Sequence, residues 1–137
     1  MPAPSPTSPE SPAASRIRVL LADDHQMVRQ GLASLLEHEP DIEVVGEAAD
    51  GEEAVVLAES LQPDVILMDY NMPKMTGIEA TARILRAQPE TRIIGLSLYE
   101  EREMASAMRS AGAIAYLSKG CSTDELCRAI RAAQPES

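Results

Sequence analysis

Hydrophobic residues along the chain follow two alternating spacings. Short, nearly continuous apolar runs are typical of strands that are buried on both faces of a sheet. Five such runs predict strands at Ile17–Ala22, Ile42–Ala48, Val65–Met68, Ile93–Leu96 and Ala115–Leu117. After each run, apolar residues recur at the spacing of one helix face. The residues that carry this helical spacing are Val28, Leu32, Leu35, Leu36, Ala54, Val55, Ala58, Leu61, Ile78, Ala82, Leu85, Met104, Ala105, Met108, Ala111, Leu126, Cys127, Ile130 and Ala133.

Proline and glycine separate these segments. Pro40, Pro63 and Pro89 each fall between a helical segment and the next strand, where the helix must stop. Gly112 closes the fourth helical segment in the same way. Strands that alternate with helices favour an α/β fold with a five-stranded parallel sheet and helices on both faces. The crossovers of such a sheet are right-handed, and its cleft lies outside the carboxyl ends of the strands.

Reactive side chains follow four of the five predicted strands. In chain order they are Asp23 and Asp24, then Asp69, Ser97 and Lys119. Each one alone has an ordinary explanation, because Asp and Ser cap helices, Asp occurs in turns and Lys is usually exposed. Independent caps and turns have no reason to gather at the one edge where such folds bind ligands. We therefore interpret the five residues as one site.

The chemistry of this group favours phosphoryl transfer with a metal. Three carboxylates repel one another unless a cation neutralises them. Oxygen ligands, with His25 as the one neighbouring histidine, favour Mg²⁺ over Zn²⁺. A carboxylate beside Mg²⁺ can act as a nucleophile and become an aspartyl phosphate. The Lys119 amine and the Ser97 hydroxyl would then neutralise and bind the phosphoryl oxygens.

Other phosphate sites fit the sequence less well. The chain has no G-x-G-x-x-G fingerprint and no Walker loop. A flavodoxin would place a phosphate-binding loop after the first strand, where this chain has two acids. Phosphatases of the haloacid-dehalogenase type have Asp-x-Asp, whereas this chain has Asp69-Tyr70-Asn71, so fast hydrolysis of an intermediate is not expected.

Composition excludes several classes of protein. The formal net charge is -10, and residues 1–69 hold 14 acids against 3 bases. This charge and the near absence of aromatic residues, with three Tyr and no Phe or Trp, argue against direct nucleic-acid binding by this chain. No apolar run approaches the ~20 residues that cross a bilayer. The two cysteines and the absence of a secretory signal favour a reducing cytoplasm.

The sequence resembles the receiver domains of two-component response regulators. The motifs that carry the resemblance are Asp23-Asp24, Asp69-Tyr70-Asn71-Met72-Pro73 with Gly77, Ser97, and Tyr116 with Lys119. The stretches LLADDHQMVRQG and LSLYEEREMASAMRSAGAIAYLSKG look most like receivers that precede a LuxR-type helix-turn-helix, as in NarL/FixJ-like regulators. The resemblance implies the flavodoxin-like, CheY-like (βα)5 fold with strand order 2-1-3-4-5. It covers residues 16–133, and it leaves 1–15 as a disordered Pro/Ser-rich tail and 134–137 as a C-terminal end or the start of a linker.

The resemblance also implies a role for each motif residue. Asp69 would accept the phosphoryl group from a sensor histidine kinase, and Lys119 and Ser97 would contact it. Asp24, Asp23, Asp69 and the backbone carbonyl of Asn71 would bind Mg²⁺. Ser97 and Tyr116 would form the switch that changes the face made by the fourth helix, fifth strand and fifth helix. Asn71 and Tyr99 occupy positions that tune the lifetime of the phosphate.

Two positions depart from the usual pattern. Many receivers have a cis proline after the site lysine, but this chain has Gly120, so a trans bond or a mixture is expected. Ser97 replaces the commoner threonine, which keeps the hydroxyl but loses the stiffness of a β-branched side chain.

The expected output is regulation of transcription. It would act through a DNA-binding domain that this chain lacks, with homodimerisation on phosphorylation and no membrane contact. The alternatives are a stand-alone receiver that acts by protein contacts, a receiver-like docking module, and a Mg²⁺-dependent phosphohydrolase on the same fold. A receiver catalyses its own phosphoryl transfer and slow autodephosphorylation, but it is not an enzyme with turnover.

Overall fold

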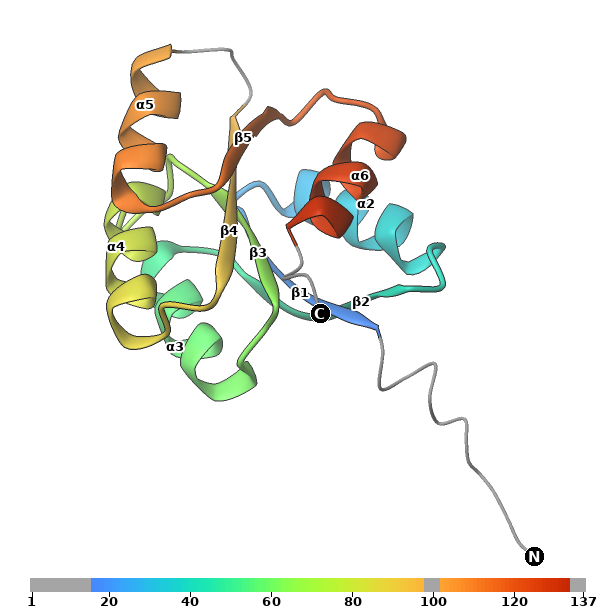
Figure 1. The fold of residues 1–137 in the computed structure, drawn as a ribbon, viewed down its shortest axis with the longest axis horizontal. Helices are drawn as coiled ribbons and strands as arrows, with labels where there is room; N and C mark the ends of the chain where they lie inside the picture. The colour runs from blue at the N-terminus through green and yellow to red at the C-terminus, as the bar shows by residue number, and fades with distance from the viewer. Residues whose placement is uncertain (1–15, 98–101, 134–137) are drawn as a thin grey trace, which may run out of the picture.

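The computed structural model describes residues 16–97 and 102–133 and contains the predicted parallel sheet (Figure 1). The strand order is β2-β1-β3-β4-β5, with every neighbouring pair parallel, and this confirms the expected order. The strands are β1 (Ile17–Ala22), β2 (Ile42–Ala48), β3 (Val65–Asp69), β4 (Arg92–Ser97) and β5 (Ala115–Ser118). The expected tail at 1–15, the end at 134–137 and the position of Tyr99 lie outside the described residues.

Helices cover both faces of the sheet, as Figure 1 shows. The helices are α2 (Gln26–Glu37), α3 (Gly51–Leu61), α4 (Gly77–Ala87), α5 (Arg102–Ala111) and α6 (Thr123–Ala132). One face carries α2 and α6, and the other carries α3, α4 and α5. The fourth helix, fifth strand and fifth helix expected from the sequence are therefore α5, β5 and α6.

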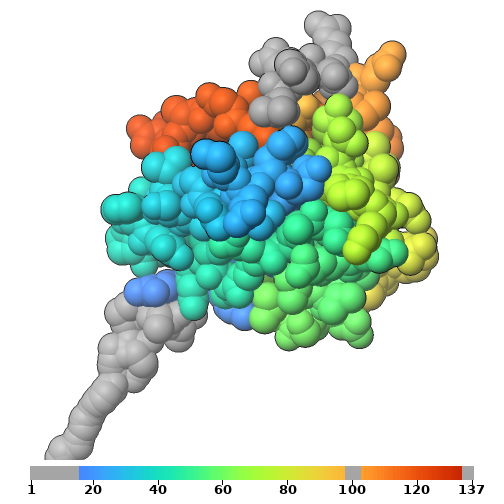
Figure 2. All heavy atoms as spheres, turned by 180° about the vertical axis from the view of Figure 1, so that it is seen from behind, coloured from blue at the N-terminus to red at the C-terminus, as the bar shows by residue number. Residues whose placement is uncertain are grey.

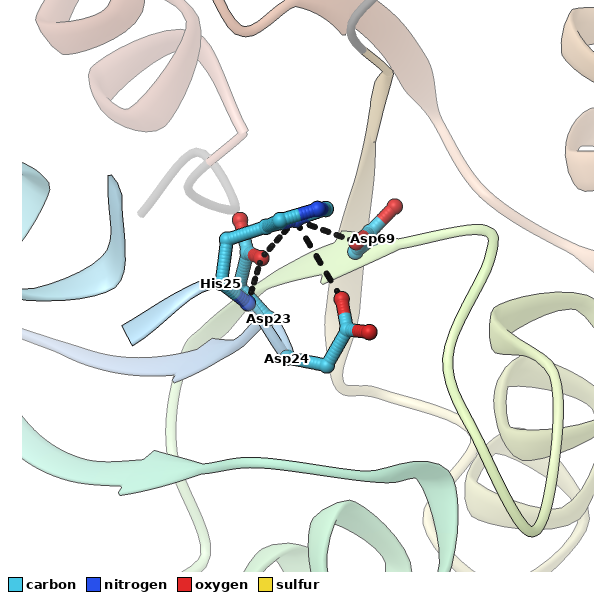
Figure 3. A group of neighbouring side chains, drawn as sticks. All are labelled: Asp23, Asp24, His25 and Asp69. Carbon is cyan, nitrogen blue, oxygen red and sulfur yellow. Dashed lines mark hydrogen bonds and ion pairs between the residues drawn. The ribbon is translucent and has the colours of Figure 1, made fainter. Parts of the chain in front are cut away.

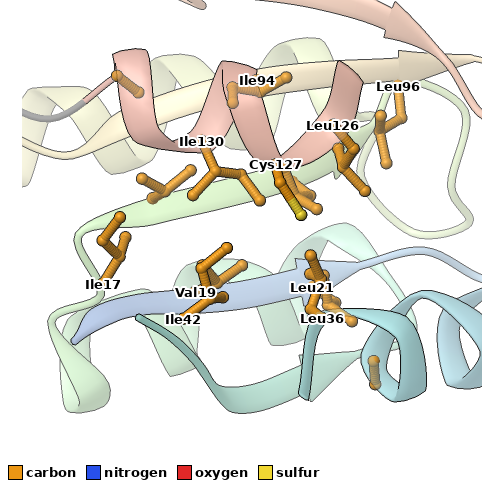
Figure 4. Close-up of a cluster of buried hydrophobic side chains, with 14 residues drawn as sticks. Ile17, Val19, Leu21, Leu36, Ile42, Ile94, Leu96, Leu126, Cys127 and Ile130 are labelled. Atoms are coloured by element: carbon orange, nitrogen blue, oxygen red, sulfur yellow. The ribbon is translucent and has the colours of Figure 1, made fainter. Parts of the chain in front are cut away.

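Two aliphatic cores hold the layers together. Every residue of β3 is buried, because this central strand has helices above and below it. On one side, Leu36 of α2 and Ile130 of α6 share a core with Leu21 and Ile94 of the sheet (Figure 4). Burial of a side chain of this size contributes about 1.5–3 kcal/mol to the stability of the fold. This packing holds the strands in place, and with them the residues at their carboxyl ends.

The buried face of α4 differs from the expected one. Ile78 and Leu85 pack only at the margin of the second core. The fully or nearly fully buried residues of this helix are Gly77, Ala80, Thr81 and Ile84. Small side chains allow α4 to approach α3 closely, and this close approach turns the helix away from the face that the largest apolar residues suggest.

Three of the described helices have a side-chain N-cap. Asp50, Thr76 and Ser122 accept hydrogen bonds from the backbone N–H three residues later, at the starts of α3, α4 and α6. α2 is different, because its N-cap residue is His25 and no side chain caps it. Neither Asp23 nor Asp24 therefore serves as the cap of α2, and both carboxylates are available for the site.

A surface ion-pair network joins the end of α6 to the start of β2. Arg131 donates two hydrogen bonds to Asp41, at 2.7 and 2.9 Å, and a third to Glu39 at 2.8 Å. The bond from Arg131 lowers the pKa of the Asp41 carboxyl. Both side chains of this pair are more than two-fifths exposed, so solvent screening keeps the contribution to about 1 kcal/mol.

We predict that Arg131→Gln lowers the free energy of unfolding at pH 7 and that this loss shrinks at low pH. The folded-state pKa of Asp41 is depressed, so the stabilisation is present above the unfolded-state pKa of about 3.9 and is lost as the pH falls below it. Denaturant unfolding between pH 7 and pH 3 measures the difference from wild type. Arg83→Gln, which removes an exposed pair with Glu79 on α4, is the control. An equal loss at both pH values would contradict the prediction.

Within the described ranges, no helix is both long and apolar enough to span a bilayer. The same residues contain no cis peptide bond, so the bond between Lys119 and Gly120 is trans, which is one of the two outcomes expected from the sequence.

Candidate functional site

The sheet register brings the predicted site residues to one edge. Asp69, the last residue of β3, pairs with Leu96, so Ser97 lies one step further along β4. Ser97 in turn pairs with Ser118, and Lys119 follows directly. The main-chain N–H of Lys119 donates to the carbonyl of Ser97 at 2.7 Å, which extends the ladder to the rim.

Lys119 joins two carboxylates that are far apart in sequence. Its ammonium lies 2.9 Å from Oδ2 of Asp23 and 3.0 Å from Oδ2 of Asp69. All three side chains are at most 3% exposed, so water screens these contacts little. Burial lowers the pKa of Lys119, but its contacts with Asp23 and Asp69 outweigh this effect and hold the pKa above its usual range. Lys119 is therefore a fixed cation.

The two oxygens of Asp69 have different partners. Oδ1 accepts a hydrogen bond from the main-chain N–H of Asn71 at 3.1 Å, which is the turn interaction expected of an Asp at a strand end. Oδ2 faces the Lys119 ammonium. Burial raises the pKa of Asp69, and the contacts with Lys119 and the Asn71 N–H only partly offset it. Asp69 thus makes the turn interaction and also pairs with the ammonium of Lys119.

Asp24 and His25 complete the cluster at the rim. The Nδ1 atom of His25 lies 3.1 Å from Oδ1 of Asp23 and 3.3 Å from Oδ1 of Asp24 (Figure 3). It is also 3.9 Å from Oδ2 of Asp69. Asp23 and Asp69 are buried, whereas Asp24 and His25 are exposed, so the cluster opens to solvent on one side.

The donor set fits a divalent cation. One atom from each of Asp23, Asp24, His25 and Asp69 can be chosen so that all four lie within 4.8 Å of one another. Three carboxylates beside a single ammonium leave an excess of negative charge, which a bound cation would neutralise. Carboxylate oxygens open to water are ligands that Mg²⁺ prefers. The residues present therefore could hold Mg²⁺, and three of them are the predicted carboxylate ligands.

The loop after β3 is held tightly against the site. The N–H of Gly77 donates to the carbonyl of Tyr70 at 2.8 Å, so α4 begins directly behind Asp69. A Cβ atom on Gly77 would lie 2.0 Å from the main-chain oxygen of Asp69. Only a residue without a side chain fits there, and the glycine thereby fixes the position of the carboxylate.

The two predicted switch residues lie on neighbouring strands. Ser97 is buried at the end of β4. Tyr116 lies on β5 opposite Gly95, and its ring fills the space where a Cβ of that glycine would stand, 2.6 Å from Cδ1. The hydroxyl oxygen of Tyr116 is buried. The ring therefore points inward, between β4 and the helices of its face.

Two residues near the cluster were not predicted as members of the site. His25 follows Asp24 directly, and this adjacency was the available signal. Arg29, on the first turn of α2, donates to the carbonyl of Asp23 at 2.6 Å and to Glu47 at 2.9 Å. Nothing in the hydrophobic pattern indicates that an arginine at this position reaches back to the rim. Its effect is to fix the backbone that carries Asp23.

In the described part of the chain, three segments meet around the cluster. Figure 2 shows the blue start of α2 next to the yellow-green residues after β3 and the orange-red residues after β5. The contacts among Asp23, Asp69 and Lys119 join the same three segments. The fold and this site define an α/β domain whose parallel sheet carries a buried carboxylate, a buried ammonium and an acidic cluster that could hold a cation at its carboxyl edge.

The chain belongs to the family of response regulator receiver domains, whose model matches residues 19–131. It is 53% identical over 117 residues to the transcriptional regulatory protein LiaR of Bacillus subtilis, and the match covers 85% of this chain and 56% of that protein. It is 44% identical over 115 residues to the response regulator UvrY of Escherichia coli, and the match covers 84% of this chain and 53% of that protein. The chain thus spans little more than half the length of these relatives.

Solved structures agree with this assignment. A LuxR-family two-component response regulator from Aurantimonas is 38% identical, with a TM-score of 0.81, and the match covers 86% of this chain and 84% of that one. The response regulator domain of Thermotoga maritima CheB is 40% identical, with a TM-score of 0.80, over 86% and 96% of the two chains. The resemblance to receivers of LuxR-type regulators, first seen in the motifs, is therefore confirmed.

Proposed function

We propose that this domain is a phosphorylation-controlled switch whose acceptor is Asp69. The observation that carries the proposal is the position of Oδ2 of Asp69, 3.0 Å from the buried ammonium of Lys119 and beside the carboxylates of Asp23 and Asp24. An acceptor oxygen needs nearby positive charge to bind the phosphoryl oxygens, and this arrangement supplies it.

The transfer step is a displacement at phosphorus. A carboxylate oxygen of Asp69 attacks the phosphorus of a phosphohistidine on a sensor kinase. The P–N bond breaks, its electron pair stays on the imidazole nitrogen, which takes up a proton from solvent, and an aspartyl phosphate forms. Lys119 moves from pairing with the free carboxylate to pairing with the phosphoryl oxygens, and the Ser97 hydroxyl donates to another of these oxygens.

The cation of this site would be Mg²⁺, held by Asp23, Asp24, Asp69 and the main-chain carbonyl of Asn71. It would neutralise the phosphoryl oxygens during transfer. The carboxylate geometry supports the three side-chain ligands. The role of the Asn71 carbonyl comes from the family motif, and so does the influence of Asn71 and Tyr99 on the lifetime of the phosphate.

Phosphorylation at the site would change the conformation of the face formed by α5, β5 and α6. Ser97 moves toward the phosphoryl group, and the ring of Tyr116 changes its rotamer in the space beside Gly95. Such a local event biases an element that has two arrangements. The partners would be a sensor histidine kinase and, on phosphorylation, a second copy of the receiver. A DNA-binding domain elsewhere in the protein would provide the output.

The proposal is tested by labelling the protein with a small acyl phosphate. We expect one phosphoryl group per chain in the presence of Mg²⁺, none when the metal is chelated, and none for Asp69→Asn. Asp124→Asn changes an exposed acid in the first turn of α6 and should label like wild type. Intact-protein mass spectrometry makes the measurement. Equal labelling of Asp69→Asn and wild type would contradict the proposal.

The same assay distinguishes the two alternatives that use the same fold. A Mg²⁺-dependent phosphohydrolase would release phosphate continuously and leave the protein unlabelled. A module that only docks partners would neither label nor release phosphate with any donor. Either result would replace the proposal, because a receiver holds its phosphoryl group and turns it over slowly.

A further inference from the structure

We propose that the imidazole of His25 is a nitrogen ligand of the cation site, so that the site binds Ni²⁺ and Co²⁺ far more tightly than carboxylates alone would. This inference rests on the proposed function, because it adds one ligand to the same site. It goes further by assigning the class of cation that the site prefers.

The distances around His25 are those between ligands of one metal ion. Two atoms bonded to a six-coordinate ion at ~2.1 Å are ~3.0 Å apart in adjacent positions and ~4.2 Å apart in opposite ones. The Nδ1 atom of His25 lies 3.1 Å from Asp23, 3.3 Å from Asp24 and 3.9 Å from Asp69, measured to carboxylate oxygens. All three separations fall within that interval, and Figure 3 shows the ring directed toward the three carboxylates.

The contacts of Nδ1 are mutually incompatible as simple hydrogen bonds. The Lys119 ammonium, 3.2 Å away, can only donate to this nitrogen. The carboxylates of Asp23 and Asp24 can only accept from it when they are charged. One ring nitrogen cannot accept and donate together. A cation bound between Nδ1 and the carboxylate oxygens would accept a lone pair from each of these atoms. Nδ1 would then act only as an electron-pair donor, and the conflict would disappear.

Among the described residues, the ring of His25 makes no contact that would hold it away from the cluster. It is the N-cap residue of α2, but its side chain makes no capping bond. The side chain is 49% exposed at the rim, so a ligand can exchange there. The backbone N–H of His25, which donates to Oδ1 of Asp23 at 2.8 Å, keeps the residue beside the first carboxylate whatever the side chain is. A substitution at this position therefore changes the donor set more than the fold.

Nitrogen in the donor set steepens the rise in affinity from Mn²⁺ to Ni²⁺ and raises both relative to Mg²⁺. Carboxylate and water ligands suit Mg²⁺, whereas imidazole favours Co²⁺, Ni²⁺ and Zn²⁺, with affinity rising from Mn²⁺ toward Ni²⁺. Loss of the imidazole should therefore weaken Ni²⁺ binding by at least about tenfold and change Mg²⁺ binding less than twofold. The opposite arrangement, in which the ring obstructs the site, predicts that every cation binds more tightly without it.

The test uses calorimetric titrations of the metal-free full chain with Mg²⁺, Mn²⁺ and Ni²⁺ at one pH. His25→Ala is expected to show a rise in affinity from Mn²⁺ to Ni²⁺ at least about tenfold smaller than that of wild type, while Mg²⁺ binding persists. His38→Ala removes the other histidine, which contacts Ser34 at the far end of α2, and should match wild type. The visible absorption bands of bound Co²⁺ should shift in His25→Ala, because a nitrogen ligand is replaced by water. An unchanged thermal midpoint of His25→Ala shows that the fold is retained.

The outcomes separate this inference from the proposed function. Equal Ni²⁺ affinity in wild type and His25→Ala, or tighter binding of all three cations by the variant, would overturn the role of His25. Asp24→Asn should weaken Mg²⁺ and Ni²⁺ together. If wild type bound no Mg²⁺, the proposed cation site itself would fail, whatever His25→Ala did.

Discussion

Lys119→Gln is expected to lower the free energy of unfolding by about 3 kcal/mol in metal-free buffer at neutral pH. The substitution removes the ammonium that pairs with both Asp23 and Asp69, and it leaves two carboxylates buried without a cation. Millimolar Mg²⁺ should restore part of the loss, because a bound cation neutralises the same carboxylates. Denaturant unfolding with and without the metal measures both effects.

The matched control for this substitution is Lys74→Gln. Lys74 pairs with Asp50 at 3.6 Å, and its side chain is 63% exposed, so its removal should change stability by less than about 0.5 kcal/mol. Equal effects of the two substitutions would show that burial of the Lys119 ion pairs does not matter. A Lys119→Gln variant as stable as wild type would contradict the role of this residue as the internal cation.

Gly77→Ala should lower the free energy of unfolding by about 3 kcal/mol. The added methyl carbon would stand 2.0 Å from the Asp69 carbonyl oxygen and 2.7 Å from the Cα atom of Tyr70. Both are backbone atoms, so relief requires α4 or the end of β3 to move. Because that movement displaces Asp69, labelling by an acyl phosphate should fall as well.

Gly31→Ala is the control of opposite sign. Nothing lies within 4 Å of the Cβ position at Gly31, which is in the interior of α2, so alanine should stabilise the helix by about 0.5–1 kcal/mol. Urea unfolding of both variants provides the comparison. If Gly31→Ala lowered the free energy of unfolding, or Gly77→Ala raised it, the close approach of α4 to the Asp69 backbone would not be what determines the effect of these substitutions.

Much of the fold follows from local patterns in the sequence. The apolar runs predict all five strands within a residue or two. The inner strands β1, β3 and β4 are almost fully buried, which leaves little choice of residue, whereas the edge strands β2 and β5 are only partly buried, contrary to the burial on both faces that their apolar runs suggested. The carboxyl ends of parallel strands share one edge, and this is why Asp23, Asp69 and Lys119 could be expected to meet. The strand order came from the family motifs, since periodicity alone does not specify which strands are neighbours.

Other features depend on packing that no local pattern records. The buried face of α4 is made of small residues such as Ala80 and Thr81, because α3 lies close by. Whether His25 points into the cluster depends on its rotamer at the start of α2. The reach of Arg29 to the carbonyl of Asp23 requires β2 to be in place, since Glu47 holds the other side of the guanidinium.

The most direct test of the account is to locate the phosphoryl group after labelling in Mg²⁺. Peptide mapping of the labelled full chain measures which residue carries it. We predict a single modified residue, Asp69, with the carboxylates of Asp23 and Asp24 and the imidazole of His25 unmodified. A phosphoryl group on any of those three residues, or labelling that persists in Asp69→Asn, would contradict it.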